Sequence, residues 1–373
     1  MINSIPDKLP LYLKLSQIIM GLVAVFFVLY IGKQIIVPLI FATIIAILLN
    51  PVVNYLCGKR VNRVVAIAIA LLIAIVVITF ITWFLTSQIA RFSDSLPLFK
   101  QKFVVFLTDV ENWVGQTLNI PKEKLDARIA STRSEMMSGG TDIIGQVLGT
   151  IGGLFVFLFL LPVYTFMILF YKPLLLQFIA ELFPNEKHKA VAEVLVETKS
   201  LIQNYLIGLL IEAALVATLN SASLLVLGIQ YAILIGVIGA ILNVIPYIGG
   251  LIAISIPMLI AFATKSPITA LWVFIAYLVV QFIDNQFFVP KIVASKVKIN
   301  ALVSIIVVLI GSALWGVAGM FLSIPLTAII KVIFDKVTPM KPFGFLLGDN
   351  QPDIGKMIFD FKYPTRKRKV IAK

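Results

Sequence analysis

Long runs of apolar residues, separated by glycine, proline or charged residues, follow one another along this chain. About eight such segments are present: 15–31, 35–50, 64–86, 143–171, 205–228, 232–263, the run before Pro290, and 301–331. About 20 apolar residues rising 1.5 Å each cross a hydrocarbon core of about 30 Å. The pattern therefore predicts an all-α fold, a polytopic helical membrane protein.

Composition supports the same fold. Hydrophobic residues make up 60% of the chain and the mean hydropathy is +1.04, against about 45–50% apolar residues in a soluble domain. Inside lipid only helices and closed barrels pair every backbone group, and the alternating pattern of barrel strands is not seen. A soluble enzyme is therefore not expected.

The charges indicate the topology. The net charge is +13, and most cations stand beside apolar runs, which argues against a nucleic-acid partner. Lys59, Arg60 and Arg63 share a short loop that the positive-inside rule places in the cytoplasm, and the N-terminus with it. The tail ends in the basic run 366–369, a cytoplasmic anchor that can contact anionic lipid. We expect a multi-pass protein of the bacterial inner membrane with both termini in the cytoplasm.

Changes in hydropathy divide the chain into six parts. They are three membrane helices in 1–86, an extracytoplasmic amphipathic helical region in 87–142, a membrane helix in 143–172, a cytoplasmic interfacial helix in 173–204, a core membrane region with broken helices in 205–334, and a basic cytoplasmic tail in 335–373. Gly145, Gly149 and Gly153 have the small-residue spacing that lets helices approach closely, so self-association is an open possibility.

Two segments, 232–263 and 301–331, are interrupted by glycine and proline. Each is long enough for one span or for a re-entrant hairpin. Either arrangement leaves the C-terminus inside, but only hairpins bring Lys291, Lys296 and Lys298 to the cytoplasmic side, so hairpins are favoured. The spacing Gly236-x-x-Gly239 before Pro246 is echoed by Gly316-x-x-Gly319 before Pro325, which suggests an internal repeat.

The first candidate for a functional residue is Asp284. It shares one helical face with Gln281 and Asn285. An acid at the centre of a membrane costs about 2.5–3.5 kcal/mol and is usually kept for contact with an ion, a proton or a polar solute. The alternative is an interfacial carboxylate, because Pro290 follows closely.

Glu212 is the second acidic candidate. It falls on a stripe with Tyr205 and Gly208, while Asn220 is predicted to lie off that stripe. A protonatable carboxylate there would couple transport to protons, and the alternative is an acid satisfied within a helix interface.

Asn243 and the following break complete the candidates. Pro246, Tyr247 and Gly249 belong to a run that would unwind a helix and present carbonyl groups to a cation or hydroxylated solute. A simple tight turn is the alternative.

The sequence lacks the motifs of the common enzyme classes. The chain has no phosphate-binding loop, no H-E-x-x-H and only one cysteine, Cys57, so no catalytic residue, metal site or cofactor is predicted. A membrane protease with two facing aspartates is also disfavoured, because Asp284 is the only aspartate well inside the late helices.

An ordered set of motifs runs through the second half of the chain. It consists of Asn243-Val-Ile-Pro246-Tyr-Ile-Gly249, Gln281-Phe-Ile-Asp284, Pro290, and Gly316-x-x-Gly319 through Ile324-Pro325-Leu326. The set resembles the autoinducer-2 exporter (AI-2E) family, also called PerM-like, most strongly over 205–331. The resemblance implies a membrane protein with eight helices, with export of a small furanone signal in some members and sodium/proton antiport in others. Asp284 matches the family pattern, whereas Glu212 stands where the family has a polar residue.

The expected function is secondary transport. A site lined by the candidates from Asn243 to Asn285 would alternate between the two sides of the membrane, moving a small polar solute such as autoinducer-2, or exchanging a monovalent cation for a proton. A multimeric channel and a membrane scaffold without transport remain the alternatives, and neither substrate identity nor direction follows from the residues.

Overall fold

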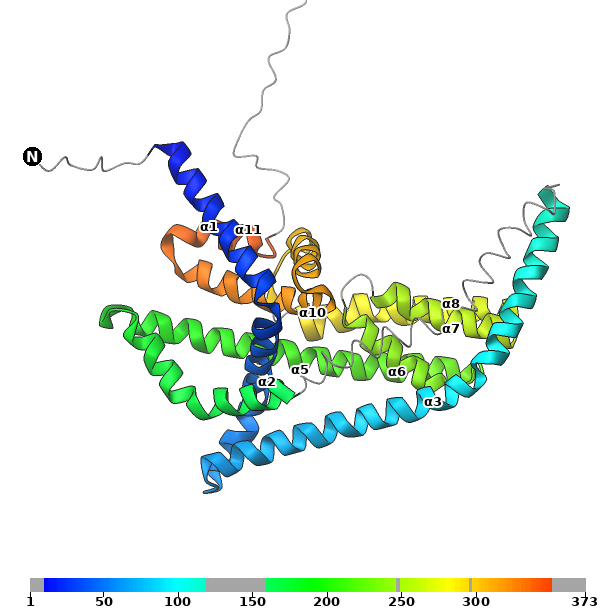
Figure 1. Ribbon diagram of the computed structural model, residues 1–373, viewed down its shortest axis with the longest axis horizontal. Coiled ribbons are helices and arrows are strands. Elements are labelled where there is room, and N and C mark those ends of the chain that lie inside the picture. Colours follow the sequence, from blue (N-terminus) through cyan, green and yellow to red (C-terminus); the bar gives the residue numbers. More distant parts are fainter. Residues whose placement is uncertain (1–9, 119–158, 246–248, 295–296, 351–373) are drawn as a thin grey trace, which may run out of the picture.

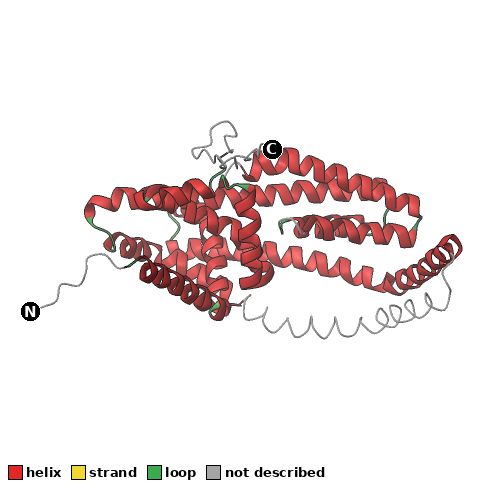
Figure 2. Ribbon diagram, turned by 90° about the horizontal axis from the view of Figure 1, so that it is seen from above, coloured by secondary structure: helices red, strands yellow, loops and turns green. Residues whose placement is uncertain are grey.

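The computed structural model describes residues 10–118, 159–245, 249–294 and 297–350, and this part of the chain is almost entirely helical (Figures 1 and 2). In chain order the helices are α1 (Leu11–Ile31), α2 (Lys33–Gly58), α3 (Arg63–Leu118), the helix Phe159–Glu181, η1 (Asn185–Lys187), α5 (His188–Val226), α6 (Ala232–Asn243), α7 (Gly249–Thr264), α8 (Pro267–Ile283), the π-helix η2 (Asp284–Ala294), α10 (Ala301–Lys336), η3 (Thr338–Met340) and α11 (Lys341–Leu347). Among the described residues, seven helices are long and apolar enough to cross a membrane. The predicted polytopic helical fold is confirmed.

Two long helices run past the predicted segment boundaries. α3 continues beyond residue 86 to Leu118, and α5 passes from the polar stretch before residue 204 into the apolar stretch without a break. Hydropathy changes at both points, but neither offers a glycine or a proline that would interrupt the backbone hydrogen-bond ladder. The glycines at 145, 149 and 153 lie outside the described residues.

α6 and α7 form a short helical hairpin. α6 has 12 residues, about 18 Å at 1.5 Å per residue, which is too short for a hydrocarbon core of about 30 Å. The two helices are antiparallel, because Gly239 faces Ala253 and Gly249 packs on the carbonyl group of Leu242. The structure therefore has the hairpin rather than the single span in this segment.

α10 is bent back on itself in the same way. Trp315 and Gly316 have non-helical backbone angles, and Gly316 has a φ of 61°. On either side of the bend Gly311 and Gly319 pack backbone against backbone. The bend lies against α1, since Trp315 Nε1 donates to the carbonyl oxygen of Leu29 at 2.9 Å. The second predicted hairpin is thus also present.

The two glycine pairs of the suggested repeat occupy different places. Gly236 and Gly239 lie within α6, where Gly236 packs on Ser221 of α5, whereas Gly316 forms the bend of α10. The two glycine pairs have similar spacing in the sequence but different structural roles. The first pair lies within α6 and allows helix packing, whereas the second includes the bend of α10 itself.

α5 connects the packed regions of the molecule (Figure 1). Its C-terminal end packs with α6, α7 and α8 around Leu224, and its N-terminal half packs with α2 and α10 around Ile202. A third cluster joins α2 and α3 to the helix Phe159–Glu181 around Ile67. The tips of the α6–α7 hairpin, the end of α8 and both arms of α10 therefore converge beside the middle of α5.

The glycine contact within α10 gives a test of the hairpin. A methyl group at Gly319 would overlap the carbonyl oxygen of Gly311, while one at Gly21 of α1 would meet nothing within 4 Å. Gly319→Ala is therefore expected to destabilise the folded protein by about 1–3 kcal/mol, as overpacking does, and Gly21→Ala is not. Melting temperatures of the purified proteins in detergent check this, and equal values would contradict the close packing of the two arms.

Candidate functional site

A cavity of about 770 Å³ lies where these helices converge. The polar side chains that line it are Tyr205, Glu212, Asn243, Tyr277, Gln281, Asp284, Asn285 and Ser304. The remaining lining is mostly aliphatic and includes Leu209, Ile254 and Ile324. A mostly apolar cavity with a few convergent polar groups is typical of a small-molecule site.

Asp284 is the most enclosed of these polar residues, with only 1% of its surface exposed. Its Oδ2 accepts from Asn243 Nδ2 at 2.8 Å and from Gln281 Nε2 at 3.4 Å. Its Oδ1 is buried and has no hydrogen-bond partner among the described residues. Each oxygen of a buried carboxylate needs a partner, so Asp284 Oδ1 is available to a bound ion, proton or solute.

The backbone at Asp284 explains how this side chain is placed. α8 ends at Ile283, and the chain continues from Asp284 as an 11-residue π-helix. π-helical turns are rare and occur frequently at functional sites. The wider turn starts at the carboxylate and allows Asn285, which accepts from Gln281 Nε2 at 3.4 Å, to line the same cavity.

Glu212 brings a second carboxylate to the cavity from α5. It is 7% exposed, and it is close enough to Asp284 for the two groups to repel each other when both are ionised. Burying two like charges in one apolar-walled space is unfavourable unless a cation or a proton accompanies them. The pair therefore favours a positively charged occupant.

Gly208 lets α5 approach the π-helix closely. A methyl group at this position would lie 2.7 Å from the carbonyl oxygen of Ile292. Gly208 stands one turn before Glu212 on the buried side of α5. The absence of a side chain here therefore helps to hold Glu212 beside the π-helix that begins with Asp284.

Behind Asp284 lies a second, much smaller cavity. It has a volume of about 10 Å³, close to the smallest space that admits a water molecule. Asn220 Oδ1, Tyr277 Oη and Asp284 Oδ1 are all buried beside it without a hydrogen-bond partner among the described residues. Gly239 provides the space, since a methyl group there would lie 3.3 Å from Tyr277 Oη.

The predicted site residues are mostly brought together. Asp284, Gln281, Asn285, Asn243 and Glu212 line one cavity, although they come from three different helices and the π-helix. Gly249 serves the turn between α6 and α7 instead, and its neighbour Gly250 faces the cavity. Pro246 and Tyr247 lie outside the described residues.

Sequence reasoning missed Asn220 and Tyr277. Asn220 was predicted to lie off the Glu212 stripe, but it is 3% exposed on the same buried side of α5. The prediction was wrong because α5 is enclosed by several helices, so its buried surface is wider than a single stripe. Tyr277 lies one turn before Gln281 on α8, and that spacing was a signal for it.

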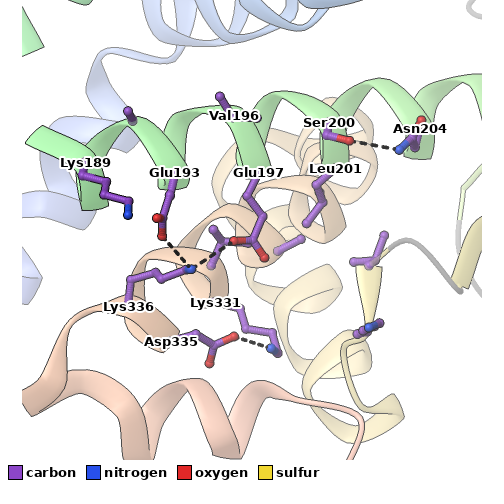
Figure 3. Close-up of a pocket in the computed structure, with 15 residues that line it drawn as sticks. Lys189, Glu193, Val196, Glu197, Ser200, Leu201, Asn204, Lys331, Asp335 and Lys336 are labelled. Carbon is purple, nitrogen blue, oxygen red and sulfur yellow. Dashed lines mark hydrogen bonds and ion pairs between the residues drawn. The ribbon is translucent and has the colours of Figure 1, made fainter.

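A larger cleft of about 850 Å³ lies between α5 and the second arm of α10. Figure 3 shows Lys336 of α10 between Glu193 and Glu197 of α5, at 3.4 and 3.9 Å. Lys331 pairs with Asp335 in the same way, at 2.6 Å. These charges satisfy one another and all except Lys331 are about half-exposed, so such pairs are each worth about 1 kcal/mol at most.

The cleft and the central cavity meet at one residue. Val297 lines both and is itself 6% exposed. The cleft therefore lies beside the central cavity, and Val297 stands between the two. All of its carboxylates are paired with lysines, whereas three buried oxygens beside Asp284 have no hydrogen-bond partner among the described residues, so the central cavity is the better candidate for binding.

Comparison with known proteins agrees with this arrangement. Residues 19–338 match the model of a family described as AI-2E family transporter. This chain belongs to that family. It is 28% identical over 342 residues to YrrI of Bacillus subtilis (strain 168), covering 88% of this chain and 96% of YrrI.

Two relatives from Escherichia coli (strain K12) are also similar. The AI-2 transport protein TqsA is 25% identical over 319 residues, covering 85% of this chain and 90% of TqsA. PerM is 28% identical over 213 residues, covering 56% of this chain and 60% of PerM. This AI-2E family chain is thus a multi-pass membrane transporter.

The close approach at Gly208 can be tested directly. Gly208→Ala should push α5 away from the π-helix, lowering stability by about 1–3 kcal/mol even though alanine favours helix. Gly58→Ala, with nothing within 4 Å of the new methyl group, is the matched control. Melting temperatures in detergent provide the measurement. A Gly208→Ala protein as stable as the control would show that the contact with Ile292 is dispensable.

Proposed function

We propose that this AI-2E family protein is a secondary transporter of the bacterial inner membrane, with both termini in the cytoplasm, that moves a small polar solute through the central cavity. The observation that carries the proposal is the buried Asp284, which is held by amides at the breaks of two helices and has one oxygen without a partner among the described residues. Breaks in membrane helices commonly mark transport sites.

The solute side of the proposal rests on the cavity lining. The amides of Asn243, Gln281 and Asn285 offer both donors and acceptors, which suit a hydroxylated solute. The volume of about 770 Å³ falls within the usual range for small-molecule sites. Because the relative TqsA is named as an AI-2 transport protein, autoinducer-2 is the first solute to test.

The driving force is proposed to be a monovalent cation or a proton bound at Asp284. Three oxygens beside the small cavity have no partner within the described part of the chain, and one of them belongs to a carboxylate, a set that suits a hard cation. Glu212 adds a second negative charge nearby. An exchange of one cation for one proton would keep the net buried charge the same in both states.

Movement between the two sides would require Val297 to leave its place between cavity and cleft. The half-exposed ion pairs of Lys336 bridge α5 and α10 beside it. Such pairs are weak enough to break and re-form during a transport cycle. The cleft is thus proposed as the cytoplasmic exit.

Flux in proteoliposomes tests the proposal. We expect saturable uptake of autoinducer-2, or saturable exchange with a sodium or lithium gradient. Asp284→Asn and Glu212→Gln should reduce that flux about ten-fold or more, because each removes a buried charge from the cavity. Asp349→Asn and Glu181→Gln remove exposed carboxylates outside it and should leave flux unchanged.

Other outcomes point to other functions. Flux that does not saturate would favour a multimeric channel. Absence of flux with every tested solute would favour a membrane scaffold without transport, or a substrate outside the tested set. A loss that is equal in Asp284→Asn and Asp349→Asn would contradict the location of the site.

Substitutions at two glycines test the proposed ion site and the solute cavity independently. A methyl group at Gly239 fills the small cavity, 3.3 Å from Tyr277 Oη, while one at Gly250 enters the large cavity, 3.0 Å from Gln281 Oε1. Gly239→Ala is expected to remove the dependence of flux on the cation gradient. Gly250→Ala should instead raise the KM for the solute. Unchanged cation dependence in Gly239→Ala would place the coupling ion elsewhere.

A further inference from the structure

A separate polar cavity of about 500 Å³ lies between α2, the start of α3 and the helix Phe159–Glu181. Its polar lining comes from Asn50, Asn54, Cys57, Arg63 and Lys172. No residue of the solute cavity takes part. We propose that this cavity binds the phosphate of an anionic membrane lipid.

Asn50 shows that the cavity is built for an acceptor. Its side chain is 5% exposed, and Lys172 Nζ donates to its Oδ1 at 3.0 Å. Because a lysine can only donate, this contact fixes which end of the amide faces it. Asn50 Nδ2 is therefore a buried donor, and it has no partner among the described residues.

Arg63 and Lys172 each have N–H groups beyond those used in hydrogen bonds to other described residues. Arg63 uses one of its five N–H groups on the carbonyl oxygen of Leu169, at 2.8 Å. Lys172 uses one of three on Asn50. Arg63 and Lys199 of α5 are both close enough to Lys172 to repel it. Since no carboxylate is among the described residues that line the cavity, the site lacks the negative charge that would balance these cations.

The surroundings of the cavity favour lipid over a soluble anion. Arg63 closes the short basic loop that contains Lys59 and is expected on the cytoplasmic side. Leu176, which lines the cavity, is 41% exposed, and Tyr171, the residue before Lys172 on the same helix, is 47% exposed. A head group held by the cations would leave its acyl chains along these apolar surfaces. Basic pockets between membrane helices on the cytoplasmic side are known to bind anionic head groups.

The experiment uses the purified, delipidated full chain in detergent. Dioleoylphosphatidylglycerol or dioleoylphosphatidylcholine is titrated in, and native mass spectrometry measures the bound lipid. The wild type should bind the anionic lipid more tightly than the zwitterionic one. Arg63→Gln and Lys172→Gln should each weaken that binding about five-fold. Lys59→Gln is the matched control, because Lys59 belongs to the same loop but lies over the ring of Tyr55 outside the cavity.

A third variant tests the orphan amide. Asn50→Asp has the same shape, pairs with Lys172 and puts a negative charge where the phosphate would bind. It should abolish the preference for the anionic lipid, and size-exclusion chromatography reports whether it remains folded. Equal weakening by Lys59→Gln and Lys172→Gln would overturn the proposal, as would equal binding of the two lipids by the wild type. Binding of inorganic phosphate with the same variant dependence, without binding of the anionic lipid, would assign the cavity to a soluble anion instead.

Discussion

Burial of the Asp284 carboxylate is the constraint on which the central part of this protein depends. A charge withdrawn from water needs hydrogen-bond donors and a counter-charge nearby, because the apolar interior offers neither. Asn243 supplies the shortest hydrogen bond, and it stands at the end of α6, where the helix stops short. The broken helices and the buried acid therefore belong to one arrangement: the break brings the amide to the carboxylate.

Small residues make this arrangement possible. The α6–α7 hairpin and the bent α10 bring backbone groups together at Gly249 and at Gly311 with Gly319, and α5 approaches the π-helix at Gly208. In a membrane, where hydrophobic surface gains nothing by leaving lipid, close packing is a main source of helix association. The same packing leaves two cavities beside Asp284, one sized for a small solute and one for a single ion or water molecule.

Much of the site was predicted from particular residues. The spacing of Gln281, Asp284 and Asn285 placed three polar side chains on one helical face, and all three line the central cavity. Periodicity failed where burial was wider than one stripe, as at Asn220. At Gly249, where the sequence left a solute-contacting break and a tight turn open, the packing on Leu242 corresponds to the turn. Helix ends were hardest to place in α3 and α5, because a change in hydropathy does not end a hydrogen-bond ladder.

The sequence by itself determined the polytopic helical class, the family and the residues with which a buried charge would be held, because length, hydropathy and local spacing are properties of the chain alone. Only the tertiary structure decided that Glu212 and Asp284 share one cavity, that both broken segments are hairpins, and that Asn50, Arg63 and Lys172 surround a cavity of their own. Contacts between residues far apart in sequence depend on how helices pack, and packing is set by side chains from several helices at once.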